Sequence, residues 1–104
     1  MASLHRYRKG VRREHQARQL LRAAGYTVAR TAQSRGPFDL VALNNQHVRL
    51  VAVKAGTARH TPQERAALAD VAAPPCVTKE LWTFPDRVPL PQVTVLQASR
   101  QVSS

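Results

Sequence analysis

The chain has 104 residues, of which 16 are Lys or Arg and 6 are Asp or Glu, so its formal net charge is +10. This length allows one domain that buries about two-thirds of its unfolded surface, and it excludes a second domain. The single cysteine excludes a disulfide framework and fits a cytoplasmic location, in a host cell if the protein is viral. Because no apolar run has the length of a signal peptide core or a membrane span, we expect neither secretion nor membrane contact.

The basic residues are concentrated in the first third of the chain. Residues 1–35 contain nine of the Lys and Arg residues and only one acid, Glu14, so they carry +8 of the net charge. Such density in a small folded domain favours a polyanionic partner, because each phosphate contact releases condensed counterions. The prediction is a nucleic-acid partner, against the plainer interpretation of a solvated basic surface.

The chain begins with a polar, basic segment, residues 1–9, which predicts a flexible arm. It either contacts phosphates or is a disordered terminus. Residues 10–97 form the predicted domain, and residues 98–104 a frayed tail. From residue 10 to residue 24 the apolar residues follow a helical period that predicts a buried stripe, and Gly25 occupies the position of a left-handed C-cap.

Glu14 lies at the edge of the predicted buried stripe of this helix, three residues before Ala17. An acid in that position requires a partner. Arg18, four residues later, and the neighbouring Arg13 are the local candidates for an ion pair.

The central feature is a β-hairpin over residues 36–54, in which two runs rich in Val and Leu flank an Asn-Asn-Gln-His turn. A symmetric turn sets Asp39 opposite Ala52, with their Cβ atoms about 5 Å apart. Because side chains alternate along a strand, Asp39 and Lys54 share one face. An acid and a lysine therefore converge at the open end of the hairpin.

The other elements follow from local patterns. A Thr-Pro-Gln-Glu capping box predicts a helix that runs to residue 73, and a pair of prolines ends it. The strand after this helical crossover is expected to pair with the second hairpin strand. The predicted remaining elements are a strand at 26–31, a polar loop at 32–36 on the rim of the site, a strand at 78–84 and an edge strand at 92–96.

The hairpin residues carry a resemblance to a known family. Pro37-Phe38-Asp39 followed by Ala52-Val53-Lys54 resembles the motif of the PD-(D/E)xK nuclease superfamily. Lys9-Gly10, Glu14 and the segments 25–30 and 34–43 are similar, in order and spacing, to archaeal-type Holliday junction resolvases over about residues 8 to 56. The resemblance implies an α/β, restriction-endonuclease-like fold, with a mixed central sheet of about five strands flanked by two helices.

The resemblance also implies a Holliday junction resolving endonuclease that makes metal-dependent paired cuts in four-way DNA junctions. Mg²⁺, with Mn²⁺ as a substitute, would be held by Asp39, by Glu14 and by the backbone carbonyl of Val53, and Lys54 would stabilise developing charge. No small-molecule cofactor is implied. The family has Glu where this chain has Ala52, so we expect the protein to be catalytically impaired.

The expected partners are four-way or branched DNA and a second copy of the chain. A junction has two equivalent strands to cut, which calls for a two-fold symmetric homodimer. The predicted DNA-binding residues are Arg8, Lys9, Arg12, Arg13, Arg30, Ser34, Arg35, His60 and Lys79. For three of them a non-functional role is the alternative: Ser34 as a turn residue, and His60 and Lys79 as ordinary surface residues.

Three explanations for Ala52 remain open. It is an engineered inactivating substitution, a natural loss of catalysis, or a sign that the acid comes from elsewhere in the chain. The intact set of Asp39, Lys54 and Glu14 favours the first. Two alternative functions also remain open. One is a non-catalytic protein that binds branched DNA on the same fold, and the other is a nuclease for other DNA structures, although so small a chain has no room for a separate sequence-reading domain.

Overall fold

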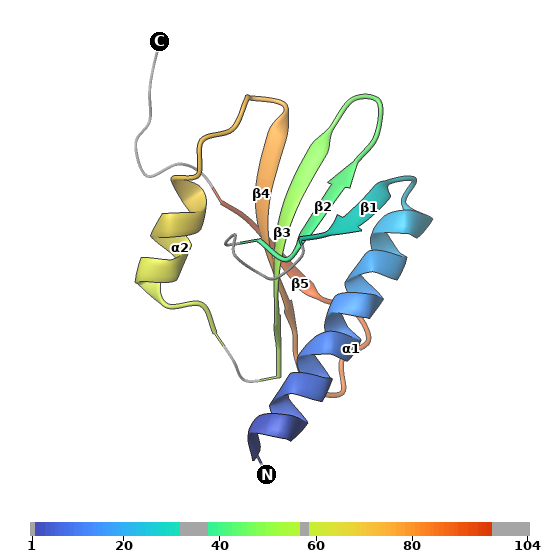
Figure 1. The fold of residues 1–104 in the computed structure, drawn as a ribbon, viewed down its shortest axis with the longest axis vertical. Coiled ribbons are helices and arrows are strands. Elements are labelled where there is room, and N and C mark those ends of the chain that lie inside the picture. The colour runs from blue at the N-terminus through green and yellow to red at the C-terminus, as the bar shows by residue number, and fades with distance from the viewer. Residues whose placement is uncertain (1, 32–37, 57–58, 97–104) are drawn as a thin grey trace.

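The structure, a computed structural model, describes residues 2–31, 38–56 and 59–96, and for residues 2–10 the backbone alone. Five strands form one sheet in the order β1-β2-β3-β4-β5, in which β3 and β4 are parallel and the other neighbours antiparallel. The two helices lie on opposite faces of this sheet (Figure 1). The elements are α1 (Ala2–Ala23), β1 (Thr27–Arg30), β2 (Leu40–Leu43), β3 (Val48–Ala55), α2 (Pro62–Ala69), β4 (Val77–Phe84) and β5 (Gln92–Leu96). The predicted mixed α/β architecture is confirmed, and it is consistent with a restriction-endonuclease-like fold.

The first helix is longer than predicted. α1 begins at Ala2 rather than at Gly10, so the backbone of the predicted basic arm is helical. The prediction relied on the apolar period, which marks only the part of a helix that packs on a core. Lys, Arg and Leu sustain a helix by their own propensity and leave no such period. The predicted tail at 98–104 lies outside the described residues.

The end of α1 is a Schellman motif, as the glycine position predicts. Gly25 has a φ of 96°, a left-handed conformation that costs glycine little. The N–H of Tyr26 donates to the carbonyl of Leu21 at 3.1 Å, and the N–H of Gly25 donates to the carbonyl of Arg22 at 3.0 Å. This closure turns the chain directly into β1. It also leaves Ala24 exposed, against the prediction that Ala24 extends the buried stripe.

The predicted register of the hairpin is confirmed along β2 and β3. Leu43 lies opposite Val48, and the ladder continues to Leu40 opposite Val51. The turn is fixed by Asn44, whose Oδ1 accepts the N–H groups of the two residues before β3 at 2.9 Å each. The register therefore follows from the turn and the alternation, as expected of a short local hairpin.

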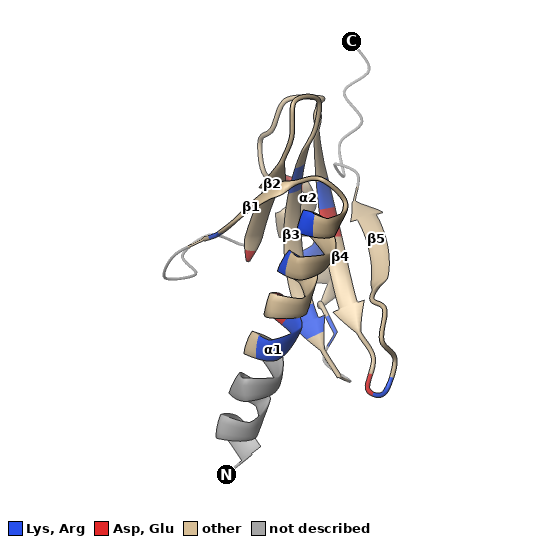
Figure 2. Ribbon diagram, turned by 90° about the vertical axis from the view of Figure 1, so that its right-hand side faces the viewer, with Lys and Arg blue, Asp and Glu red and all other residues tan. Residues whose placement is uncertain are grey.

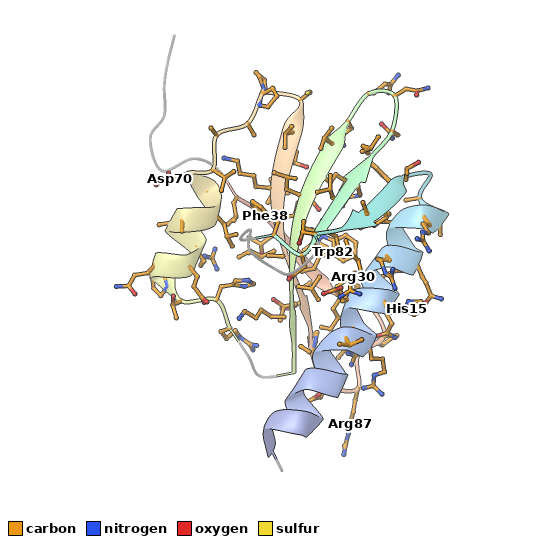
Figure 3. All side chains as sticks on the ribbon, viewed as in Figure 1. His15, Arg30, Phe38, Asp70, Trp82 and Arg87 are labelled. Carbon is orange, nitrogen blue, oxygen red and sulfur yellow. The ribbon has the colours of Figure 1, made fainter. Side chains whose placement is uncertain are left out.

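Each face of the sheet has its own apolar cluster. The cluster under α1 includes Ala17, Leu21, Val51 and Trp82, and Figure 3 labels Trp82 on the ribbon. The cluster under α2 consists of Phe38, Ala52, Leu68 and Leu81. Because alternate residues of β3 point to opposite faces, neighbouring Val51 and Ala52 enter different clusters. Ala52 thus points to the face of the sheet that α2 covers.

The second helix is capped as predicted and ends earlier than predicted. Thr61 Oγ1 accepts the N–H of Glu64 at 3.0 Å, and Glu64 Oε1 accepts the N–H of Thr61 at 2.8 Å, which completes the capping box. The helix stops at Ala69, before the predicted end at residue 73. Leaving the helix there lets Val71 pack against the cluster under α2.

Candidate active site

A pocket opens on the α2 face of the sheet, where β2 begins and β3 ends. Its volume is about 270 Å³. That is below the usual size of a pocket for a drug-sized ligand, and it leaves room for an ion with its waters or for one phosphate group. Its walls come from the residue before β2, from β3, from the segment before α2 and from the first two turns of α2. The lining residues are Asp39, Ala52, Val53, Lys54, His60, Glu64, Ala67 and Leu68.

Asp39 is held by the backbone on both sides. Its N–H donates to the carbonyl of Val51 at 2.8 Å, and its carboxylate Oδ2 accepts the N–H of Val53 at 2.7 Å. Its own carbonyl accepts the N–H of Thr31 at 3.0 Å. The Asp39 carboxylate thus accepts a β3 backbone N–H that a neighbouring strand would otherwise bind, just beyond the last β2–β3 pair, Leu40 with Val51. A carboxylate fixed in this way keeps acceptor capacity for a ligand, since its two oxygens offer about four lone-pair sites.

Lys54 and the α2 residues supply the charges around Asp39. Glu64 has a lowered pKa, first because the Thr61 N–H donates to its carboxylate and then because Lys54 is positively charged. Burial lowers the pKa of the His60 ring, and the charge of Lys54 lowers it further. At neutral pH the Glu64 carboxylate is therefore ionised and the His60 imidazole is uncharged.

Ala52 lies 2% exposed in the pocket wall and also belongs to the apolar cluster under α2. It carries no polar atom beyond its backbone. The structure therefore provides space on β3 between Asp39 and Lys54 but no oxygen ligand from a side chain at that position.

Glu14 is the position where the structure departs most from the predicted site. Its carboxylate pairs with Arg30 Nε at 2.6 Å, not with Arg18 or Arg13 on its own helix. Arg18 instead contacts the ring of His15 at 2.9 Å. The pair joins α1 to the end of β1 on the opposite face of the sheet from α2, and Glu14 does not line the pocket that contains Asp39.

The predicted metal ligands are therefore not assembled into a protein cage. Among the residues that the structure describes, no group of three or more His, Cys, Asp or Glu side chains could hold a metal ion. The pocket nevertheless contains two carboxylates, those of Asp39 and Glu64. Mg²⁺ is commonly bound through one or two carboxylates, several waters and substrate phosphates. The pocket fits an ion of that kind, completed by a phosphate, and it does not fit a preformed all-protein site.

A comparison with protein-family models gives the family. The model described as archaeal Holliday junction resolvase matches residues 5–64, which is more than half of the chain. The chain belongs to the archaeal Holliday junction resolvase family. A search of curated proteins found no match. The matched segment runs from α1 to the first turn of α2, so it contains the pocket residues of β2 and β3.

Membership of this resolvase family supports a junction-resolving function and binding to branched DNA. Among the described residues, no helix is long and apolar enough to cross a membrane. Figure 2 colours several positions along the described part of α1 blue, and these positions are arginines. Arg12 and Arg22 on this helix are exposed, as a phosphate contact requires.

Two of the predicted DNA-binding residues make contacts within the protein. Arg13 is only 7% exposed, and its guanidinium lies 5.3 Å from the centre of the Phe84 ring and donates to the carbonyl of Pro85 at 3.2 Å. Lys79 Nζ donates to the carbonyl of Ala69, the last residue of α2, at 2.5 Å. Both cations satisfy contacts that only tertiary packing creates. Arg13 is buried in this arrangement, whereas Lys79 is half-buried and uses one of its donors in this bond.

Of the other predicted DNA-binding residues, the structure describes some and not others. Arg30 is about half exposed but paired with Glu14. His60 lines the pocket rather than its surroundings. Ser34, Arg35 and the side chains of Arg8 and Lys9 lie outside the described residues, so these four remain predictions.

Glu64 is the pocket residue that the sequence analysis assigned only to helix capping. The sequence contains a signal for this position, in the spacing of Glu64 and Leu68. The first turn of a helix that follows a strand in a parallel crossover packs back towards the sheet, and Glu64 lies four residues before the buried Leu68. That spacing places Glu64 on the helix face that meets the sheet.

Proposed function

We propose that this chain is a Holliday junction resolving endonuclease that makes metal-dependent paired cuts in four-way DNA junctions. The observation that carries the proposal is the pocket in which Asp39 and Lys54 lie on one face of the β2–β3 hairpin, in a chain of the archaeal resolvase family. A bound Mg²⁺ or Mn²⁺ would supply an activated water and would neutralise charge on the phosphate. Asp39 and the carbonyl of Val53 would hold the ion.

Lys54 has a separate task in this proposal. Its ammonium is a compact charge with three donors, and Lys54 lines the same pocket as Asp39. It would orient the attacking water or stabilise the negative charge that develops on the phosphate oxygens. The hydrogen bond from the Val53 N–H at 2.7 Å would hold the Asp39 carboxylate in place for the ion.

We propose that cleavage is slow because position 52 lacks the carboxylate of the family motif. Mg²⁺ gives up its waters reluctantly and requires fixed oxygen ligands, so losing one lowers both its occupancy and its orientation. Junction binding does not depend on this ligand. The protein should therefore bind junctions well and cut them poorly.

The proposed dimer would use the surface around β5. This strand is at the end of the sheet order and carries exposed apolar side chains, Val93 at 46% and Val95 at 57%. The preceding loop adds Leu90 at 62% exposure. Apolar residues along an open strand edge favour pairing with another strand, and a second copy of the chain would give two cutting sites related by two-fold symmetry.

A non-catalytic role is the second candidate, and the missing acid at position 52 is the observation that favours it. Such a protein would bind branched DNA on the same fold and leave it intact. Both candidates require the exposed basic surface of α1, so only cleavage separates them.

The deciding experiment compares binding and cleavage on matched DNA. The affinity for a four-way junction should exceed that for a duplex of equal length, and it should fall steeply as salt rises from about 50 to 200 mM. Slow, symmetric nicks that require Mg²⁺ or Mn²⁺ and vanish in Asp39→Asn would establish the nuclease. Equal affinity for both DNAs would contradict junction recognition, and intact junctions after long incubation would favour the binding protein.

A further inference from the structure

We infer that Glu64, at the start of α2, supplies the second carboxylate of the pocket in place of an acid at position 52. The inference rests on the proposed metal-dependent nuclease, and it concerns which residue completes the site. Its partner in the pocket is Asp39, and the cation class is a hard divalent ion such as Mg²⁺ or Mn²⁺.

The first step is the shared cavity. Asp39, Lys54 and Glu64 line the same pocket, the first from the residue before β2, the second from β3 and the third from α2. Ala52 forms part of the same lining with a single methyl group. The space that a longer side chain on β3 would take is thus open to a group that reaches across from the helix.

The second step is the docking of α2. Leu68 is 3% exposed and belongs to the same apolar cluster as Ala52, so this face of the helix packs on β3 at that point. Glu64 lies four residues earlier and therefore on the same helix face, one turn nearer the helix start. Glu64 itself is exposed, so it contributes to the pocket lining from the solvent side.

The third step is the orientation of the carboxylate. Glu64 Oε1 accepts the Thr61 N–H at 2.8 Å in the capping box, which holds the side chain in one conformation. The second oxygen and the remaining lone pairs keep acceptor capacity for an ion. A ligand already ordered by the fold loses less conformational entropy when the ion binds.

Glu14, on α1, is a poorer candidate than Glu64 for the second carboxylate. It pairs with Arg30 at 2.6 Å on the α1 side of the sheet and does not line the pocket. Recruiting Glu14 would require breaking this ion pair. Glu64 lines the pocket while its capping hydrogen bonds are in place.

The test uses Glu64→Gln, with Glu14→Gln as the matched control. Glutamine can still accept the Thr61 N–H, so the helix cap and the fold are kept while the charged ligand is lost. Mn²⁺ is titrated into the isotopically labelled full chain, and paramagnetic broadening of the Val53 amide signal reports an ion beside Asp39. Glu64→Gln should raise the Mn²⁺ concentration needed for half-broadening about tenfold or more, and Glu14→Gln should leave it within about twofold.

Cleavage of the junction gives the second readout. Glu64→Gln should abolish the slow nicking of the parent chain, and Ala52→Glu in the Glu64→Gln background should restore it. Unchanged Mn²⁺ broadening in Glu64→Gln, or no broadening of Val53 in the parent chain, would overturn the inference. If Glu64→Gln weakens Mn²⁺ binding while no protein nicks DNA, the site assignment stands and the proposed nuclease function fails. If Glu64→Gln nicks as fast as the parent chain, the nuclease function stands and the assignment fails.

Discussion

Glu80, on the α1 face of the sheet, is 2% exposed, whereas the acids of the α2 face line an open pocket. The Glu80 carboxylate accepts hydrogen bonds from Arg49 at 2.8 and 2.7 Å, from Thr78 at 2.7 Å and from Trp82 at 3.0 Å. Its acceptor capacity is thereby filled. Asp39, in the pocket, accepts a strand N–H and keeps capacity to spare.

The same network extends to the end of the sheet next to α1. The guanidinium of Arg49 lies 5.2 Å from the centre of the Tyr26 ring and 5.6 Å from that of Trp82. The ring of His47 links the Tyr26 hydroxyl to Thr78. A buried charge is tolerated when it is paired and fully hydrogen-bonded. The network around Glu80 therefore stabilises the fold and leaves the carboxylate no free acceptor site for a ligand.

The comparison shows that the role of an acid in this sheet depends on whether its carboxylate oxygens already have hydrogen-bond partners within the protein. The neighbouring residues in the sequence do not decide it. An acid whose oxygens are all bonded within the protein contributes to stability. An acid that faces an open pocket with unfilled acceptor sites is available for chemistry. Changes on the two faces should therefore have opposite consequences for stability and for activity.

The largest expected effect is on activity, from Ala52→Glu. A glutamate on β3 beside Asp39 adds a fixed oxygen ligand, and Mg²⁺-dependent nicking should rise on the order of a hundredfold. Asp39→Asn in the same background should abolish the gain, because catalytic groups that act as a unit are not additive. Junction cleavage assays with end-labelled strands measure both. A variant that binds junctions normally but stays inert would show that the metal site is placed wrongly.

The next effect is on stability, from Glu80→Gln. Removing one partner of a buried pair leaves the Arg49 guanidinium without its carboxylate and should cost about 3 kcal/mol of unfolding free energy. Because a domain of this size has a total of roughly 5–15 kcal/mol, urea unfolding resolves the change easily. Glu64→Gln is the matched control from the pocket and should lose less than about 0.5 kcal/mol. Equal losses at the two sites would remove the distinction between the faces.

Acid sensitivity should report the buried Glu80 carboxylate. Burial alone raises the pKa of Glu80, but the hydrogen bonds from Arg49, Trp82 and Thr78 outweigh it, so the pKa lies below its ordinary value of 4.5. A group with a lowered folded pKa contributes stability above its unfolded pKa and loses it as pH falls through the folded value. Urea unfolding between about pH 3 and 7 should therefore show a steep loss below about pH 4.5 that is shallower in Glu80→Gln. Parallel curves would contradict this.

The smallest effect concerns the basic residues. Lys79→Met should lose about 0.5–1 kcal/mol of stability, because Lys79 donates to the last carbonyl of α2, and should leave junction affinity unchanged. Arg12→Gln should do the reverse, lowering affinity and reducing the slope of log affinity against log salt by about 1. Fluorescence anisotropy with labelled junctions measures both affinities. A loss of DNA affinity in Lys79→Met would place Lys79 on the DNA surface after all.

The sequence by itself determined the elements whose causes are local. The Gly25 C-cap, the capping box at Thr61 and the register of the hairpin depend on residues within a few positions of one another, and each was predicted. The pairing of Asp39 with Lys54 on one face followed from alternation along those strands. The family resemblance added the fold, because its motif lies on these same local elements.

Only the tertiary structure decided which charges meet. The pairing of Glu14 with Arg30, the burial of Arg13 on Phe84 and the bond from Lys79 to the end of α2 each join residues of different elements. Such contacts depend on the distance and angle at which helices dock on the sheet, which local periodicity does not encode. The entry of Glu64 into the pocket has the same origin, since it follows from the packing of Leu68 against Ala52 rather than from any pattern around Glu64 itself.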